Sequence, residues 1–324
     1  MKKEVKTIVI DAGGRYGVHP SWKSFDGELE YYLFEPDIDE SRRLKKKYKN
    51  KKEIIVDSRA LDDRNNFLEL NILSNKAMST SFSRSSKSEY FDGEKKDQTK
   101  IIEKRKVKTI TLNNFCKNKK IKPDFLKLDV EGGEFRILKG SSEQLNNILG
   151  IRCEVNFDKT FENSPIFSRI HDMMLDNDFF LLNLDYDGKG SLRNEFVKTD
   201  EKFGILRDCD AVWIKKYEKL FDKRIKNLDV RILKYAAFCI NNNASDVAIE
   251  VLIKGINQYN INLKRLNKTY LYKFIDKAVH KLFYKLKWQP GQSLTKHKKV
   301  YLQIFGKKML ETHEYNQSLT MNPD

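Results

Sequence analysis

The stretch TIVIDAGGRYG, residues 7–17, joins a short apolar run to a bend with three glycines, and Asp11 stands where the two meet. A strand that ends in such a bend brings backbone N–H groups close to a ligand without side chains in the way. The dinucleotide fingerprint G-x-G-x-x-G is not matched, because Arg15 and Val18 stand where glycine is required after Gly13. A carboxylate here would repel a pyrophosphate, so the bend favours a cationic ligand.

A second acid follows the next apolar run. The run LEYYLF, residues 29–34, is typical of a strand, and Glu35 comes directly after it, 24 residues beyond Asp11. A carboxylate at this strand end can accept hydrogen bonds from both hydroxyls of a ribose. Glu35 alone could equally be a surface acid, but its spacing from Asp11, Gly13 and Gly17 favours a role in binding.

A third element is DFLKLDVEGGEFRILKG, residues 124–140. Asp129 and Glu131 are two residues apart, so both point to the same side of an extended strand end. Gly132 and Gly133 then turn the chain into a helix. Because open α/β sheets bind ligands at the carboxyl ends of their strands, these two acids are candidates for a site at that edge.

Strands and helices alternate through the first two thirds of the chain, which predicts an α/β fold with a mostly parallel sheet. We expect strands at 5–10, 29–34, 53–57, 125–130 and 151–155, and helices at 39–48 and 134–145 with a break at Gly140. The runs 179–185 and 210–215 have no long helix between them, which predicts an antiparallel pair at one sheet edge. Residues 79–98 are polar and turn-rich and predict a long mobile loop.

The C-terminal third is predicted to be helical, so we expect a first domain over 1–215 and a basic helical region over 216–324. Helices are expected at 230–240 and at 245–256, with Ser245 as N-cap. The stretch 266–288 is basic and amphipathic, with an apolar stripe and a lysine stripe at helical spacing: Leu271, Phe274, Ala278, Leu282 and Leu286, and Lys273, Lys277, Lys281 and Lys285. It could pack on the first domain with its lysines in water, or lie on an anionic membrane.

The charge distribution and the composition indicate where in the cell the protein resides and what kind of partner it binds. Residues 216–324 carry 21 Lys and Arg against nine Asp and Glu, which is +12 of the total +16. This excess reflects either a lysine-rich proteome or an anionic partner: a membrane surface, a phosphate-bearing carrier or nucleic acid. The four cysteines form no C-x-x-C pair, and no apolar run is long enough for a signal peptide or a membrane span. We therefore expect a cytoplasmic protein, with contact at the inner membrane face left open.

Four segments together resemble the FkbM-type methyltransferases, which depend on S-adenosylmethionine and have the class I Rossmann-like fold. The segments are IDAGGRYGVHPSW, LFEPD, LKLDVEGGEFRILKG and CEVNFDKTFENSPIF, in the same order over about residues 5–215. Carried over by position, the resemblance implies cofactor contacts from Asp11, Gly13, Gly14, Gly17, Glu35, Ala60, Leu61 and Asp129. It also implies that Asp129 and Glu131 lie beside the transferred methyl group and that Glu154, at the end of the fifth strand, faces the same cleft. His19 and Trp22 depart from the commoner pattern and leave the roof of the cofactor site open.

Methyl transfer to a sugar hydroxyl gains from a general base, and Asp129, Glu131 and Glu154 are the candidates. Alternatively, Asp129 only fixes the cofactor and Glu131 only caps the helix. The three carboxylates could also hold a divalent metal ion. The resemblance implies an O-methyltransferase acting on a surface or capsular polysaccharide or its precursor. Other hypotheses are a methyltransferase for a secondary metabolite, lipid or protein, a nucleic-acid-binding protein, and an inactive scaffold.

Overall fold

The chain folds into two compact units. The computed structural model describes residues 6–85, 97–185, 191–192, 205–222, 224–286, 289 and 291–310. The sheet unit comprises Thr7–Pro20 and Leu29–Lys219, and the helical unit comprises Met1–Lys6, Ser21–Glu28 and Leu220–Asp324. The predicted boundary between residues 215 and 216 assigned Ser21–Glu28 to the first domain, whereas in the structure this segment belongs to the helical unit.

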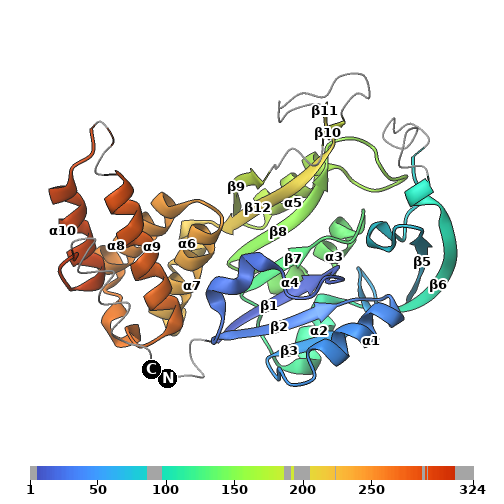
Figure 1. Cartoon of the computed structure of the whole chain (residues 1–324), viewed down its shortest axis with the longest axis horizontal. Coiled ribbons are helices and arrows are strands. Elements are labelled where there is room, and N and C mark those ends of the chain that lie inside the picture. Colours follow the sequence, from blue (N-terminus) through green and yellow to red (C-terminus); the bar gives the residue numbers. More distant parts are fainter. Residues whose placement is uncertain are drawn as a thin grey trace. The chain divides into compact units, whose positions relative to one another are not determined.

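A seven-stranded sheet forms the centre of the sheet unit (Figure 1). Its strands, in order across the sheet, are β3 (Ile54–Asp57), β2 (Leu29–Phe34), β1 (Thr7–Ala12), β7 (Phe125–Leu128), β8 (Gly150–Asn156), β12 (Asp208–Lys215) and β9 (Phe179–Asp185). The strands from β3 to β8 pair in parallel, and β12 is antiparallel to both β8 and β9. The expected parallel sheet with an antiparallel edge is confirmed. All four residues of β7 are buried, as is usual for a central parallel strand.

Helices flank the sheet strands along the chain. They are α1 (Ile38–Lys47), α2 (Leu112–Lys119), α3 (Glu134–Lys139), α4 (Ser142–Leu145), α5 (Phe167–Asp176) and α6 (Tyr217–Leu220). The side chain of Asp37 caps α1 by accepting from the backbone N–H of Asp39. The break predicted at Gly140 is confirmed, since it separates α3 from α4.

A second, three-stranded sheet was not predicted. Its order is β4 (Ala60–Leu61), β6 (Ile101–Ile110) and β5 (Phe67–Leu73), and β10 (Ser191–Leu192) pairs with β11 (Ile205–Leu206) in a further small sheet. Within the predicted loop 79–98, Thr80 bridges Asn71 and Arg84 bridges Phe161, so its first residues are held by backbone pairing. Residues 86–96 lie outside the described part of the chain.

The helical unit contains α7 (Leu228–Asn241), α8 (Ser245–Tyr259), α9 (Tyr270–Leu286) and α10 (Leu294–Phe305). The helices predicted at 230–240 and 245–256 lie within α7 and α8. The prediction that Ser245 caps α8 is wrong, because Ala244 occupies the N-cap position and no side chain caps this end. Glu28 caps α9 instead, since its carboxylate accepts from the N–H groups of Tyr270 and Leu271 at 2.9 and 3.0 Å.

The predicted apolar stripe of α9 is shifted by one residue. Ile275, Val279 and Phe283 are buried, whereas the expected Phe274 and Leu282 are only half-buried. The four lysines of the predicted polar stripe are exposed, but residues 287–288 of the predicted segment are not described. Contact of these lysines with an anionic membrane stays a prediction.

Trp22 and the cysteines belong to the packed interior. Trp22 is buried in the helical unit and stacks on Phe238 with ring centroids 5.8 Å apart, so it does not form a cofactor roof. All four cysteines are free and buried. None of the helices in the described ranges combines the length and apolar character that crossing a membrane requires.

Candidate active site

The glycine bend, Glu35 and Asp129 meet at one edge of the main sheet. The N–H of Gly13 donates to the carbonyl of Phe34 at 3.2 Å, which joins the bend to the end of β2. The N–H of Asp129 donates to the carbonyl of Ala12 at 3.0 Å, which joins the bend to the end of β7. Glu35 follows Phe34 directly, so three segments distant in sequence converge at the carboxyl ends of β1, β2 and β7.

Gly13 is required at this junction for two reasons. Its φ is +89°, a backbone region that residues with a side chain rarely adopt. A Cβ atom built on it would lie 1.7 Å from the carbonyl oxygen of Asp129. The bend therefore contacts the end of β7 through backbone alone.

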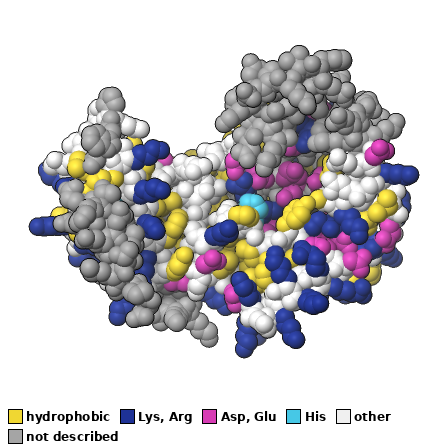
Figure 2. Space-filling view, in the orientation of Figure 1, with side chains coloured by type: hydrophobic (Ala, Val, Ile, Leu, Met, Phe, Trp, Pro, Cys, Tyr) yellow, Lys and Arg dark blue, Asp and Glu magenta, His cyan; other side chains and the backbone are white. Residues whose placement is uncertain are grey.

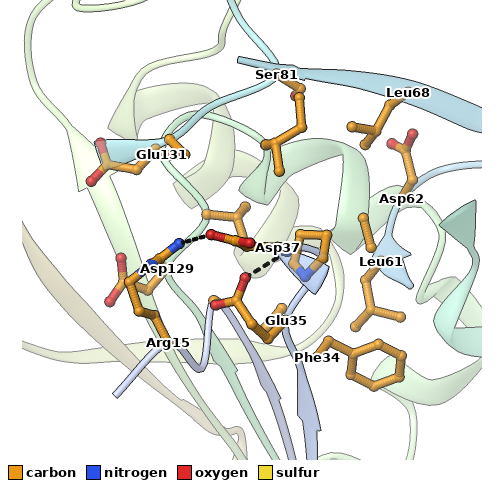
Figure 3. Close-up of a pocket in the computed structure, with 18 of the residues that line it drawn as sticks. Arg15, Phe34, Glu35, Asp37, Leu61, Asp62, Leu68, Ser81, Asp129 and Glu131 are labelled. Atoms are coloured by element: carbon orange, nitrogen blue, oxygen red, sulfur yellow. Dashed lines mark hydrogen bonds and ion pairs between the residues drawn. The ribbon is translucent and has the colours of Figure 1, made fainter. Parts of the chain in front are cut away.

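A pocket opens at this edge, and Figure 3 shows its two sides. Asp129 and Glu131 lie on one side, and Leu61 and Leu68 lie on the other, with Glu35 between them. Of the predicted residues, those that line the pocket are Gly13, Glu35, Ala60, Leu61, Asp129 and Glu131. Lining residues that the sequence did not single out include Phe34, Asp37, Asp62, Leu68 and Arg136, together with Arg15, noted only as an interruption of the glycine pattern.

Glu35 is held in place by the turn that follows it. Its side chain is 4% exposed, and Oε1 accepts a hydrogen bond from the N–H of Asp37 at 2.8 Å. Burial raises the pKa of Glu35 to about 7. Asp37 is in turn ion-paired to Arg15 at 2.6 Å and to Arg105 at 3.0 Å. Figure 3 shows the first of these pairs beside Glu35.

Asp11 is 1% exposed and is not among the residues that line the pocket. It accepts a hydrogen bond from the Tyr31 hydroxyl and lies 3.5 Å from Nζ of Lys127, which also bonds Asp129 at 3.1 Å. Burial lowers the pKa of Lys127, but the carboxylates of Asp11, Asp129 and Asp210 together raise it by more, so the ammonium is charged. Asp11 is therefore linked through Lys127 to Asp129, which lines the pocket. Its direct contact with a cofactor stays a prediction.

The other two glycines of the bend, Gly14 and Gly17, shape the loop and do not line the pocket. Gly14 packs against Leu33, and Gly17 packs against the ring of Tyr48, whose hydroxyl accepts from the N–H of Val18 at 3.0 Å. His19 has a pKa lowered to about 4, chiefly by burial and then by the positive charges of Lys127 and Arg152. Its imidazole is neutral at physiological pH.

The loop from Asp129 to Glu134 sets the direction of Glu131. Both oxygens of Glu134 accept backbone hydrogen bonds, from the N–H of Val130 at 2.8 Å and of Gly132 at 3.1 Å. Glu134, and not Glu131, thus satisfies the N–H groups before α3. Glu131 has φ of +57°, and its carbonyl accepts from the Thr80 hydroxyl at 2.6 Å.

Glu154 lines a second cavity, which shares Glu131 with the first pocket. We call it the Arg84 cavity, and it is lined by Met78, Arg84, Glu131, Glu154, Asn156, Thr160, Phe161, Arg207 and Asp208. Burial raises the pKa of Glu131 to about 8, and it raises the pKa of Glu154 well above its ordinary value, with nearby carboxylates adding to both shifts. The three predicted catalytic acids are thus divided: Asp129 lines the first pocket, Glu154 the cavity, and Glu131 both.

Figure 2 shows acidic side chains gathered in one region of a face over which Lys and Arg side chains are widely spread. No group of three or more His, Cys, Asp or Glu side chains in the described ranges is arranged to hold a metal ion. The expectation that Asp129, Glu131 and Glu154 could hold one finds no support in this geometry.

Comparison with known proteins gives one family. The model described as the methyltransferase FkbM domain matches residues 11–181. No curated protein matches the chain. Similar solved structures include TrmK of M. capricolum in complex with S-adenosyl-homocysteine, with 13% identity, 86% of this chain and 94% of that chain covered, and a TM-score of 0.32. Another is an rRNA methylase from Streptococcus thermophilus, with 9% identity, coverage of 66% and 92%, and a TM-score of 0.32.

Proposed function

The chain belongs to the FkbM methyltransferase family, and from this premise we propose that it transfers a methyl group from S-adenosylmethionine to a hydroxyl of a glycan. The glycan is a surface or capsular polysaccharide or its precursor. That the chain is an S-adenosylmethionine-dependent methyltransferase follows from the family. The glycan hydroxyl is the further step, and it is supported by two buried carboxyl groups that can take up a proton next to the cofactor pocket.

The first pocket fits S-adenosylmethionine by the chemistry of its two sides. Phe34, Leu61 and Leu68 offer an apolar surface suited to a nucleobase, and Glu35 offers a buried carboxyl group suited to ribose hydroxyls. Asp129 and the shared Glu131 stand on the opposite side, where the cationic end of the ligand would lie. Because Gly13 has no side chain, the backbone of the bend can approach the ligand at this point.

Bound S-adenosylmethionine supplies an electrophilic methyl group on a sulfonium, and the chain supplies orientation and charge. A hydroxyl acceptor must lose its proton as its oxygen forms the new bond to carbon, while the S–C bond breaks and its electron pair stays on sulfur. Glu131 is placed to take that proton on its carboxylate, because it lines both the pocket and the Arg84 cavity. Its raised pKa makes it a stronger base than an exposed glutamate once it is ionised.

The observation that carries the proposal is that Gly13, Glu35, Asp129 and Leu61 line one pocket, from four separate segments. Calorimetric titration with S-adenosylmethionine tests it, with Glu35→Ala as the variant. We expect binding by the parent chain and a clear loss in the variant. No binding by the parent chain would refute the site.

The glycan acceptor needs a separate test. Surface glycans from a strain without this gene should be hydrolysed and their O-methyl sugars measured beside the parent strain. We expect one O-methyl sugar to disappear and to return on complementation. An unchanged set of O-methyl sugars would rule out a surface glycan as the acceptor and leave the methyltransferase assignment intact.

A further inference from the structure

We propose that the Arg84 cavity binds the acceptor as a neutral sugar ring, which it holds through a second free hydroxyl on the same ring as the hydroxyl that is methylated. This inference rests on the proposed function, because it assigns the first pocket to S-adenosylmethionine. It goes further by placing the acceptor in a cavity and by naming the groups of the acceptor that are recognised.

Two buried polar atoms of the cavity have no hydrogen-bond partner among the residues that the structure describes. They are the hydroxyl of Thr160, a residue 4% exposed, and Oε2 of Glu154. Since buried polar groups are nearly always satisfied, both atoms point to a ligand that pairs with them.

Both atoms suit a hydroxyl group of the ligand. Burial raises the pKa of Glu154 well above its ordinary value, and the nearby carboxylates add to the shift, so this carboxyl group keeps its proton at neutral pH. A protonated carboxyl group and a threonine hydroxyl each donate one hydrogen bond and accept others. A sugar hydroxyl has the same two capacities, and it can therefore donate to one of these groups while it accepts from the other.

The charges of the cavity favour a neutral acceptor over an anion or a cation. Arg207 forms an ion pair with the neighbouring Asp208, and Arg84 likewise has a partner within the chain. The charge of Glu131 raises the pKa of Arg84, so these two groups attract each other once Glu131 is ionised. When Glu131 is ready to take up a proton, the two guanidinium charges of the cavity thus face two carboxylate charges, and a neutral acceptor leaves this balance intact.

Met78 and Phe161 add apolar surface to the cavity. Phe161 is 5% exposed, and its ring packs against Gly132. A sugar ring carries C–H groups on its faces and hydroxyls around its edge, so it can pack on apolar side chains while its hydroxyls reach polar ones. Apolar walls with a few polar groups that fix orientation are typical of small-molecule sites.

The backbone holds Thr160 and Phe161 in place. The N–H of Ser85 donates to the carbonyl of Thr160 at 3.1 Å, and Phe161 forms a bridge with Arg84. The N–H of Thr160 donates to the carbonyl of Asp158 at 2.9 Å. The Thr160 hydroxyl therefore projects from a paired segment, as a residue that positions a ligand requires.

The shared wall separates the roles of the two hydroxyls. Glu131 lines both the first pocket and the Arg84 cavity, whereas Glu154 and Thr160 line the cavity alone. The hydroxyl at Glu131 loses its proton to that carboxylate as its oxygen takes the methyl group from sulfur. The hydroxyl at Glu154 and Thr160 keeps its proton and holds the ring. Because the charge of Glu131 acts on Glu154 within one cavity, we expect both hydroxyls to belong to a single ring.

The first test compares neutral and charged sugars by saturation-transfer NMR, with S-adenosyl-homocysteine present. The neutral probes are the methyl glycosides of glucose, galactose and mannose. Each is measured beside its uronate, which is anionic, and its 6-amino-6-deoxy analogue, which is cationic. We expect at least one neutral glycoside to bind at least tenfold more tightly than both of its charged counterparts, because a charge brought into the cavity finds no partner there.

The second test removes single hydroxyls from the neutral glycoside that binds best. Its monodeoxy analogues are measured in the same way. We expect two of them to bind several-fold more weakly than the complete sugar, one for the hydroxyl at Glu131 and one for the hydroxyl at Glu154 and Thr160.

Thr160→Val separates binding from folding. Because the hydroxyl has no partner among the described residues, its loss should leave the melting temperature unchanged or higher. The same variant should weaken the best neutral glycoside several-fold, and it should no longer distinguish that glycoside from one of the two sensitive deoxy analogues. Thr160→Ser, which keeps a hydroxyl, should bind as the parent chain does, and so should Thr295→Val at an exposed threonine of α10.

The outcomes for the two proposals are distinct. Failure to bind S-adenosyl-homocysteine would refute the proposed function. Normal binding of S-adenosyl-homocysteine with no neutral glycoside bound at millimolar concentration, or with a charged counterpart bound as tightly, would overturn the neutral acceptor alone. Fewer than two sensitive hydroxyls, or unchanged glycoside binding by Thr160→Val, would do the same.

Discussion

Replacing Gly13 with alanine should cost the chain affinity for its cofactor as well as stability. The φ of +89° costs an alanine about 1–2 kcal/mol. The new Cβ would also start 1.7 Å from the carbonyl oxygen of Asp129, whereas real Cβ atoms essentially never approach within 3.0 Å. The bend and the end of β7 must therefore separate by more than an ångström, which adds about 1–3 kcal/mol of strain.

The separation moves Asp129 relative to Glu35, so binding should suffer. A misplacement of about 1 Å can cost about a hundredfold in rate, and we expect a loss of S-adenosyl-homocysteine affinity of similar size, equal to about 3 kcal/mol. Calorimetry measures the affinity, and urea unfolding measures the stability.

Gly27 provides the matched control. Its φ is +84°, but no atom lies within 4 Å of a Cβ built there. Gly27→Ala should therefore lose about 1–2 kcal/mol of stability and keep its affinity. Equal affinity in Gly13→Ala and Gly27→Ala would refute the view that the bend holds the pocket through a backbone contact.

Four further predictions concern the acids and the lysine of the site. Glu35→Gln should weaken S-adenosyl-homocysteine about 10- to 100-fold by calorimetry, from the loss of charge-assisted hydrogen bonds, while the exposed Glu53→Gln should have no effect. The methylation rate should rise with pH through about 8, because Glu131 must lose its proton to act as base, and a Glu131→Gln variant that keeps this rise would contradict the assignment. The Glu131 carboxyl binds its proton more tightly in the folded chain than in the unfolded chain, where its pKa is near 4.5. Its contribution to stability therefore falls as pH rises from about 4.5 to about 8. Urea titrations should show that Glu131→Gln loses less stability than the parent chain over this window. Lys127→Met should cost about 3–5 kcal/mol by leaving Asp11 buried without its ion pair, and the added change Asp11→Asn should restore most of that loss; an additive double variant would count against the pairing.

The main sheet was predictable because its strands are short apolar runs between turn residues. The bounds of β2 and β9 agree with the predicted 29–34 and 179–185 to the residue. The β5–β6 pair was missed because residues 101–106 of β6 are mostly charged and mostly exposed, so the strand lacks the apolar alternation on which such a prediction depends. The omission matters, since β5 contributes Leu68 and Leu70 to the pocket.

The apolar face of α9 shows another limit of pattern reading. Two neighbouring stripes of this helix are apolar at helical spacing, and the sequence alone does not choose between them. The structure buries the stripe with Ile275 and Val279. Asp276 is buried beside it because it accepts hydrogen bonds from Tyr301 and Lys307 of the same unit. Only the packed partners reveal which stripe faces inward.

The candidate site was predictable where one short segment holds several of its residues. The bend and the block around Asp129 each carry a local pattern, and both reach the pocket. Arg84, Thr160 and Arg207 carry no such pattern, since they come from three segments that meet only through backbone pairing and sheet order. Asp62 was likewise missed, although it directly follows the predicted Leu61.

Glu131 belongs to a segment with a local sequence pattern, but its conformation depends on contacts that only the fold provides. A left-handed backbone at a residue with a side chain costs about 1–2 kcal/mol, so neighbouring contacts must hold it in place. Three contacts do so: the Thr80 hydroxyl binds its carbonyl, Glu134 binds the N–H groups on either side, and the Phe161 ring packs against Gly132. Relaxing that backbone would turn the carboxyl group away from one of the two spaces it now lines. Under the proposed mechanism, donor and acceptor meet at a common wall, and these three contacts keep the proposed proton acceptor in that wall.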